Sequence, residues 1–194
     1  MIARVATAVA MLAMLLGVWP QARAAGTIQV TRAELVKSVV GAELQLSADV
    51  YLPVTSRMRD VLALGVPLHF VLEFRLTEPR WYWRDKRVTS AEQRYRLSYH
   101  PVTRRYRVSR FGFPQDYVGL DQAIASLTHV RGWSVVSTLA LDPDVTYEAA
   151  VRMRLDTDLL PGPLQIDLFT NRDWDLESEW KRFPVTLAKA TSGR

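Results

Sequence analysis

The most regular hydrophobic pattern in the chain runs from residue 66 to residue 111 and predicts three consecutive strands. In its first part, apolar side chains alternate with mostly polar ones: Leu68, Phe70, Leu72, Phe74 and Leu76 against His69, Val71, Glu73, Arg75 and Thr77. A period of two residues places these two sets on opposite faces of a sheet. The alternation continues over 94–99 and 105–111, and the short proline-containing turn between them predicts a hairpin attached to the first strand.

Other segments have either the period of a strand or the spacing of a helix. Strands are expected at 27–36, 42–52, 133–141, 147–155 and 174–183. The first two of these strands are expected to form one hairpin, and the segments 133–141 and 147–155 another. Residues 56–64 and 119–131 have the spacing of short helices that end at Gly65 and Gly132, and 113–117 is expected to be a loop. In the last strand we expect Trp174, Leu176 and Trp180 to lie on the inner face.

These elements together predict a mainly β protein. About eight strands, two short helices and no regular βαβ order favour an antiparallel β-sandwich, immunoglobulin-like or similar. We expect residues 25–188 to form a single domain and residues 189–194 to be a disordered tail.

The first 24 residues have the features of a secretory signal peptide. Arg4 precedes an apolar run over 5–18, and a small-x-small site at Ala22-Arg23-Ala24 follows Pro20. The apolar run is shorter than the roughly 20 residues that span a bilayer. The sequence therefore predicts export to the periplasm and no transmembrane segment after cleavage; an uncleaved inner-membrane anchor is the alternative.

Charge is distributed unevenly along a chain whose formal net charge is +5. Arginine and lysine predominate between residues 57 and 110, and aspartate and glutamate between residues 111 and 180. If these parts form opposite sheets, one surface is basic and another is acidic. If they pair side by side, which we favour, the charges neutralise one another. The excess of arginine over lysine is weak evidence for phosphate recognition, and no nucleic-acid partner is expected.

Two groups of residues are candidates for a binding surface. The first is the segment Arg80, Trp81, Tyr82, Trp83 and Arg84, in which arginines beside aromatic rings suit stacking on sugars, bases or lipid headgroups. The alternative, which we favour, is that Trp81 and Trp83 cover an edge of the sandwich core. The second group consists of the arginine rows on the predicted hairpin, Arg94, Arg96, Arg105 and Arg107.

Residue patterns typical of catalysis or of metal binding are missing from the sequence. The chain has no cysteine, which excludes disulfides and thiolate chemistry. His69, His100 and His129 are not spaced as local metal ligands, and neither a Gly-x-Ser-x-Gly elbow nor a glycine-rich phosphate loop occurs. Acidic pairs such as Asp142/Asp144 are typical of solvated turns, although alternate acids also suit calcium. We expect no catalytic residue, no metal site and no cofactor.

Several motifs taken together resemble a known family. They are the signal peptide, the run Tyr95-Arg96-Leu97-Ser98-Tyr99-His100 that leads into Tyr106-Arg107-Val108, the Trp-Tyr-Trp segment, and the stretch from Asp173-Trp174-Asp175-Leu176 to Trp180. The whole mature chain resembles DUF4390, a proteobacterial domain of unknown function. The resemblance implies an exported β-rich protein without an assigned activity, often encoded near a sensor kinase and response regulator of the nitrogen-regulation type. It supplies no catalytic or binding residues.

Three functions are compatible with these observations. We favour a non-enzymatic interaction module that docks on an envelope protein, such as the periplasmic domain of a sensor kinase, through its arginine rows or its Trp81/Trp83 edge. The alternative is a periplasmic carrier that holds a glycan, a lipid or another small ligand with aromatic side chains between the sheets. An enzyme would need one of the three histidines to meet an acid and a nucleophile in a cleft.

Overall fold

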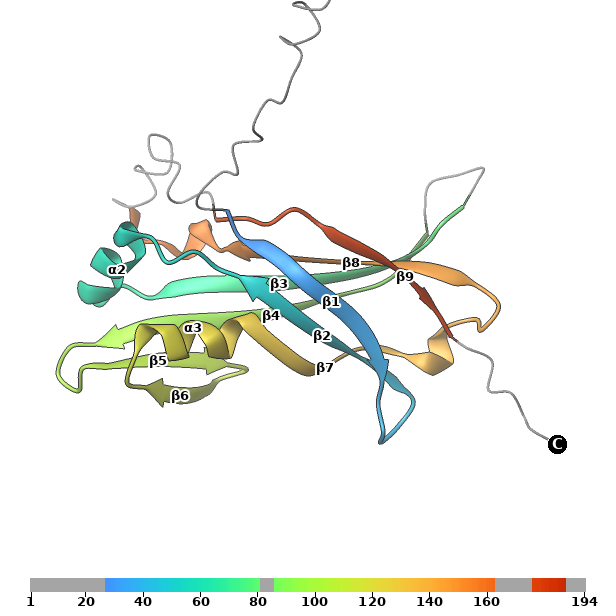
Figure 1. Cartoon of the computed structure of the whole chain (residues 1–194), viewed down its shortest axis with the longest axis horizontal. Coiled ribbons are helices and arrows are strands. Elements are labelled where there is room, and N and C mark those ends of the chain that lie inside the picture. Colours follow the sequence, from blue (N-terminus) through green and yellow to red (C-terminus); the bar gives the residue numbers. More distant parts are fainter. Residues whose placement is uncertain (1–26, 81–85, 163–175, 188–194) are drawn as a thin grey trace, which may run out of the picture.

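The computed structural model describes residues 27–80, 86–162 and 176–187, and these form two antiparallel sheets that face each other (Figure 1). The smaller sheet has the order β1-β2-β7, where β1 is Gln29–Lys37, β2 is Glu43–Tyr51 and β7 is His129–Ser137. The larger has the order β6-β5-β4-β3-β8-β9, with β6 at Phe113–Tyr117, β5 at Arg105–Arg110, β4 at Lys86–His100, β3 at Leu68–Glu78, β8 at Thr146–Leu155 and β9 at Lys181–Thr186. The expected mainly β class is confirmed, although three and six strands differ from the four and three of an immunoglobulin constant domain.

Strand β3 lies in the middle of the larger sheet and supplies the centre of the core. It pairs with β4 on one side and with β8 on the other. Its apolar set, Leu68 to Leu76 in steps of two, is fully buried against the smaller sheet. The predicted face of this strand is therefore confirmed, and its alternate residues lie on the opposite face of the larger sheet, which we call the outer face.

Helices α2 and α3 accompany the sheets in the described ranges. Helix α2, Ser56–Ala63, begins at the predicted residue, and the hydroxyl of the preceding Thr55 accepts a hydrogen bond from the Met58 amide at 3.2 Å. Gly65 follows the helix with a φ of 80°, which glycine adopts without strain. Helix α3, Leu120–Thr128, packs against β5 and β6 (Figure 1). Short 3-10 turns occur at Thr138–Ala140 and Thr157–Leu159.

The second helix is shorter than predicted, because the chain enters β7 at His129. Val130 is buried and pairs with Ala48 of β2, so the sheet and not the helix satisfies the backbone here. Gly132, predicted as a helix end, has a φ of 66° within β7. It lies at a β-bulge, where the register with β2 shifts between Leu46 and Ala48.

Three further expectations were wrong. Residues 113–117 are not a loop but the edge strand β6, which pairs with β5. Strands β7 and β8 do not form a hairpin, because β7 pairs with β2 and β8 pairs with β3 and β9, so the intervening turn carries the chain from one sheet to the other. Trp180 is not on the inner face: its ring lies between Arg75 and Arg152, whose side chains are on the outer face.

Several expectations concern residues outside the described part of the chain. These are the signal peptide at 1–24, the segment Trp81, Tyr82, Trp83 and Arg84, the inner position of Trp174, and the tail at 189–194. Among the described helices, none has the length and apolar character needed to cross a bilayer.

Candidate functional site

The outer face is densely charged, and its centre is the carboxylate of Glu73 on β3. Arg152 on β8 donates from Nε to Glu73 Oε2 at 2.9 Å, and Arg154 donates from Nε to Oε1 at 2.8 Å. The Arg75 guanidinium lies 3.7 Å from the same carboxylate. Burial raises the pKa of Glu73, but the hydrogen bonds and charges of Arg152 and Arg154 outweigh it and bring the pKa below its ordinary value.

A short segment before β9 covers the β8 side of this face. Leu155 donates its amide proton to the Leu176 carbonyl, and Ser178 donates to the Met153 carbonyl, each at 2.8 Å. The Trp180 ring then lies between two guanidinium groups, with the Cζ atom of Arg75 at 4.3 Å and that of Arg152 at 4.6 Å from its centroid. Arg152 also forms an ion pair with Glu177. The arginines on this side are therefore held by internal partners.

On the β4–β5 side of the outer face, two arginines of the predicted rows have internal partners. Arg107 donates two hydrogen bonds to Asp116 of β6, at 2.6 and 3.0 Å, which lower the pKa of that carboxyl. Arg94 lies 3.2 Å from Glu92 and 3.9 Å from Asp156. Residues from the basic and acidic parts of the sequence thus pair side by side, as favoured from the sequence.

Arg96 and Arg105 differ from these two, because neither forms an ion pair within the described ranges. Arg96 is exposed on β4, in register with His69 of β3 and Ser109 of β5. Arg105 is exposed at the start of β5, in register with His100. These two guanidinium groups keep their donors available to a partner.

A shallow hollow of about 550 Å³ lies beside Arg96. We call it the outer hollow; its lining includes His69, Glu92, Arg94, Arg96, Ser109 and Phe111. Burial lowers the pKa of His69, and Arg96 lowers this pKa further, while Asp156 opposes both. His69 is therefore neutral near pH 7, and the positive charge of the outer hollow comes from its arginines.

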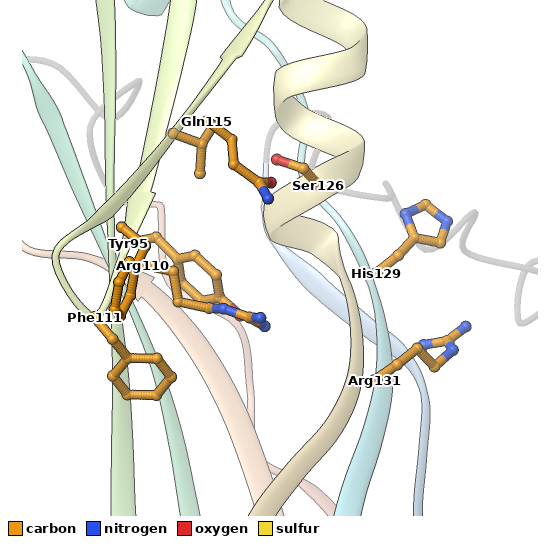
Figure 2. A pocket seen from close by; sticks show the side chains of 9 residues that line it. Tyr95, Arg110, Phe111, Gln115, Ser126, His129 and Arg131 are labelled. Carbon is orange, nitrogen blue, oxygen red and sulfur yellow. The ribbon is translucent and has the colours of Figure 1, made fainter.

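A second cavity opens at the side of the sandwich, where the larger sheet extends beyond the smaller one. We call it the side groove; it has a volume of about 480 Å³ and is lined by Tyr95, Val108, Arg110, Phe111, Phe113, Gln115, Ser126, His129 and Arg131. Figure 2 shows Arg110 extending from β5 toward β7 and the Gln115 amide facing Ser126 of α3. His129 and Arg131 start from β7 and extend away from Tyr95 in this view.

The hydrogen-bond and ion-pair partners of His129 and Arg131 explain why these side chains extend away from Tyr95. His129 Nδ1 lies 3.0 Å from the Ala125 carbonyl, and Arg131 forms an ion pair with Asp49 at 2.5 Å. Arg110 of β5, by contrast, lies across from Tyr95 in the β4–β5 ladder, and its charge opposes the rise that burial causes in the pKa of the Tyr95 hydroxyl. The floor of the side groove is therefore basic and the groove contains no described acidic residue.

The comparison with protein families gives one result. A family model for DUF4390, a domain of unknown function, matches residues 25–184. The chain belongs to the DUF4390 family. No curated protein and no solved structure matches this DUF4390 chain.

The predicted site residues of this DUF4390 protein are only partly brought together. Arg94 and Arg96 line the outer hollow, and Arg105 and Arg107 follow on the neighbouring strand. Arg80 lies 3.7 Å from Glu78 at the end of β3. The predicted stacking segment Trp81, Tyr82, Trp83 and Arg84 is outside the described residues, so its two interpretations remain untested.

The histidines do not form a common site in the described part of this DUF4390 chain. His69 lies in the outer hollow, His100 at the end of β4, and His129 at the start of β7. Within the same ranges no group of three or more histidine and acidic side chains is arranged to hold a metal ion. Asp142 Oδ1 accepts a hydrogen bond from the Asp144 amide at 2.9 Å, as expected of a turn residue.

Sequence reasoning missed the side groove, although one signal was present. Gln93 has the same phase as Tyr95 and Leu97, so a polar side chain stands where the pattern requires an inward, apolar one. Gln93 is completely buried, and its amide nitrogen donates to the Tyr95 hydroxyl at 2.7 Å. A polar residue in the buried phase therefore marks the strand position behind the groove.

Proposed function

We propose that this DUF4390 protein is a non-enzymatic interaction module that docks an acidic partner protein on the outer face of β4 and β5. The observation that carries the proposal is the pair Arg96 and Arg105, two exposed guanidinium groups that form no ion pair among the described residues. Their neighbours Arg94 and Arg107 are already paired. A carboxylate of a partner protein is therefore expected to bind Arg96 and Arg105 more strongly than the paired Arg94 and Arg107.

The physical basis is the geometry of arginine on a rigid sheet. A guanidinium group donates two parallel hydrogen bonds to one carboxylate, and these charge-assisted bonds are stronger than neutral ones. Arg96 and Arg105 project from neighbouring paired strands, so their spacing is set by the β4–β5 ladder. Charges at such a surface also accelerate encounter with an acidic partner and disfavour basic ones.

The proposed place of action is the periplasm. It rests on the signal peptide predicted for residues 1–24, which would deliver the domain to the envelope. The resemblance to proteobacterial members encoded near nitrogen-regulation-type sensor kinases makes the periplasmic domain of such a kinase the first partner to test.

The test compares two charge reversals of equal size in a pull-down from envelope extract. Arg96→Glu/Arg105→Glu changes the outer face, and Lys37→Glu/Arg59→Glu changes exposed residues of β1 and α2 that form no ion pair among the described residues. We expect the first variant to retain the partner at least about tenfold less, a loss of about 1.4 kcal/mol, and the second to retain it as wild type does. Added salt should release the partner from the wild-type protein.

An identical set of retained proteins for both variants would contradict the proposal. Arg94 and Arg107 are left unchanged in this test because their replacement would also leave Glu92, Asp156 or Asp116 without a partner. A structural change would then be mistaken for a lost contact. Circular dichroism of both variants confirms that the fold is kept.

A second candidate function is a carrier for a small ligand, and the side groove supports it. The groove lies where the larger sheet meets α3 and β7, and it is lined by Tyr95 and two phenylalanines. Its volume of about 480 Å³ falls within the usual range of small-molecule sites.

A further inference from the structure

The floor of the side groove has more hydrogen-bond donors than acceptors. Tyr95 accepts a hydrogen bond from Gln93 Nε2 at 2.7 Å, and the charge of Arg110, its neighbour across the β4–β5 ladder, acts on the same hydroxyl. Burial raises the pKa of Tyr95 to about 12, with Arg110 and Gln93 opposing this effect, so the phenol keeps its proton at neutral pH. With its oxygen occupied as an acceptor, the Tyr95 hydroxyl has a proton left to donate.

The Gln93 amide is a second sign of incomplete pairing at this place. It is fully buried, and its Oε1 atom has no hydrogen-bond partner. Exchanging the oxygen and nitrogen positions would let Tyr95 donate to Oε1 but would leave the amide nitrogen unpaired instead. A buried polar group without a partner lowers the stability of the fold by about 1–3 kcal/mol. Such a loss is more readily tolerated at a binding site than in a hydrophobic core.

The rest of the polar lining adds donors and no described carboxylate. Arg110 has no ion pair within the described ranges, so its positive charge is not neutralised there. Gln115 accepts at Oε1 from the Tyr117 hydroxyl at 2.8 Å, which leaves its amide nitrogen as a donor toward the groove. A donor-rich floor with one uncompensated positive charge favours an anionic group.

The entrance of the side groove is apolar. Phe111 and Phe113 line it although they are 64% and 78% exposed. Phe111 and Gly112 form the tight β5–β6 turn, with φ values of 51° and 82°, and Phe113 follows it. The Arg110 guanidinium is 5.9 Å from the centroid of the Phe111 ring. Two exposed aromatic rings beside a basic floor suit a ligand with an apolar body and a charged end.

We propose that the side groove binds a small amphiphilic anion with a single acidic group. The acidic group is held by Arg110 and the Tyr95 hydroxyl, and the apolar body lies against Phe111 and Phe113. Arg110 lies on the opposite face of the larger sheet from Arg96. This binding therefore needs neither the outer-face arginines nor the acidic partner proposed above.

The test uses a matched pair of fluorescent probes with the purified protein. One is 8-anilinonaphthalene-1-sulfonate, which carries a negative charge, and the other is N-phenyl-1-naphthylamine, its uncharged counterpart. The variants are Arg110→Gln, which keeps a donor but removes the charge, and Phe113→Ser. Arg87→Gln on the exposed start of β4 is the control.

We expect the sulfonate to bind the wild type and the Arg87→Gln variant equally, and the Arg110→Gln variant at least about tenfold more weakly. The uncharged probe should bind more weakly than the sulfonate and should be unaffected by Arg110→Gln. Phe113→Ser should weaken the binding of both probes. Decanoate should displace the sulfonate while decanol does not, which tests whether a carboxylate serves as the acidic group.

Three results would overturn the inference. The first is equal binding of the sulfonate by the wild type and the Arg110→Gln variant. The second is an equal loss with Arg87→Gln, which would indicate a general charge effect. The third is equal affinity for the two probes, which would indicate apolar adhesion without recognition of the anion. Unchanged thermal unfolding of Arg110→Gln confirms that any loss is local.

Discussion

Glu73 of β3 and Arg152 of β8 are 79 residues apart in sequence, and the Arg152 Nε donates to the Glu73 Oε2 at 2.9 Å. Glu73 is only 6% exposed, and Arg154 and Arg75 also contact its carboxylate. One buried acid thus balances several arginines at the centre of the outer face. This arrangement joins the central strand β3 to its neighbour β8.

The first prediction concerns the removal of this charge. Glu73→Gln leaves Arg152 and Arg154 partly buried without their shared carboxylate. We expect the free energy of unfolding to fall by about 1–3 kcal/mol, because an uncompensated buried charge is costly. Urea unfolding measures it, with Glu92→Gln on the exposed part of β4 as a control that changes stability by less than about 0.5 kcal/mol. Equal losses in the two variants would contradict the special role of Glu73.

The second prediction concerns pH. The pKa of Glu73 in the folded protein is below its ordinary value of 4.5. The contribution of the Glu73 carboxylate to the free energy of unfolding is therefore complete above pH 4.5 and is lost as the pH falls through the folded pKa. The difference in unfolding free energy between the wild type and Glu73→Gln should be constant from neutral pH to about pH 5.5 and should shrink on further acidification. Urea unfolding at a series of pH values tests this. A difference that grows toward acid would require a raised pKa instead.

The third prediction concerns the Trp180 ring between Arg75 and Arg152. Trp180→Ala removes two cation–π contacts, and we expect a loss of about 1–2 kcal/mol. The segment before β9 should also detach from β8, so hydrogen exchange should accelerate at the amides of Leu155 and Ser178. Trp180→Phe keeps an aromatic ring and should have a smaller effect. Unchanged exchange at these two amides in Trp180→Ala would show that the ring does not hold the segment.

The sequence predicted those features of the fold that depend on local periodicity. The inward face of β3, the strands β2, β5 and β8 and the start of α2 follow from the spacing of apolar residues. Strand β6 was missed because its sequence, Phe-Pro-Gln-Asp-Tyr, has no apolar alternation, and pairing with β5 holds it at the sheet edge.

Pairing between distant segments could not be predicted in the same way. A period of two identifies a strand but not its neighbour, which is why β7 and β8 were wrongly joined in a hairpin. The ion pairs of the outer face depend on that pairing as well. Of the candidate site, the arginine rows were visible as a pattern, whereas the side groove needs β5, α3 and β7 to be placed together.

The fourth prediction concerns the bulge in β7. A Cβ atom at Gly132 would lie 3.7 Å from Gln45 Oε1, which is an ordinary contact, so space does not exclude alanine. The φ of 66° does oppose it, and we expect Gly132→Ala to cost about 1–2 kcal/mol. Gly132→Asn should cost less because asparagine tolerates this conformation better. Thermal unfolding of the two variants shows which of them is less stable. An equal loss of stability in both would contradict the conformational explanation.

The most direct test of the proposed docking surface is site-specific photocrosslinking in the native envelope. A benzoylphenylalanine residue replaces Ser98 on the outer face of β4 in one variant and Ser47 of β2 in the smaller sheet in the other. Ser98 lies in register with Arg107 and two residues from Arg96, whereas Ser47 lies on the opposite layer. We predict a crosslinked partner with an acidic surface from position 98 that disappears when Arg96→Glu/Arg105→Glu is added, and none from position 47. The same crosslinked protein from both positions, or a crosslink from position 98 that survives the charge reversal, would contradict the account.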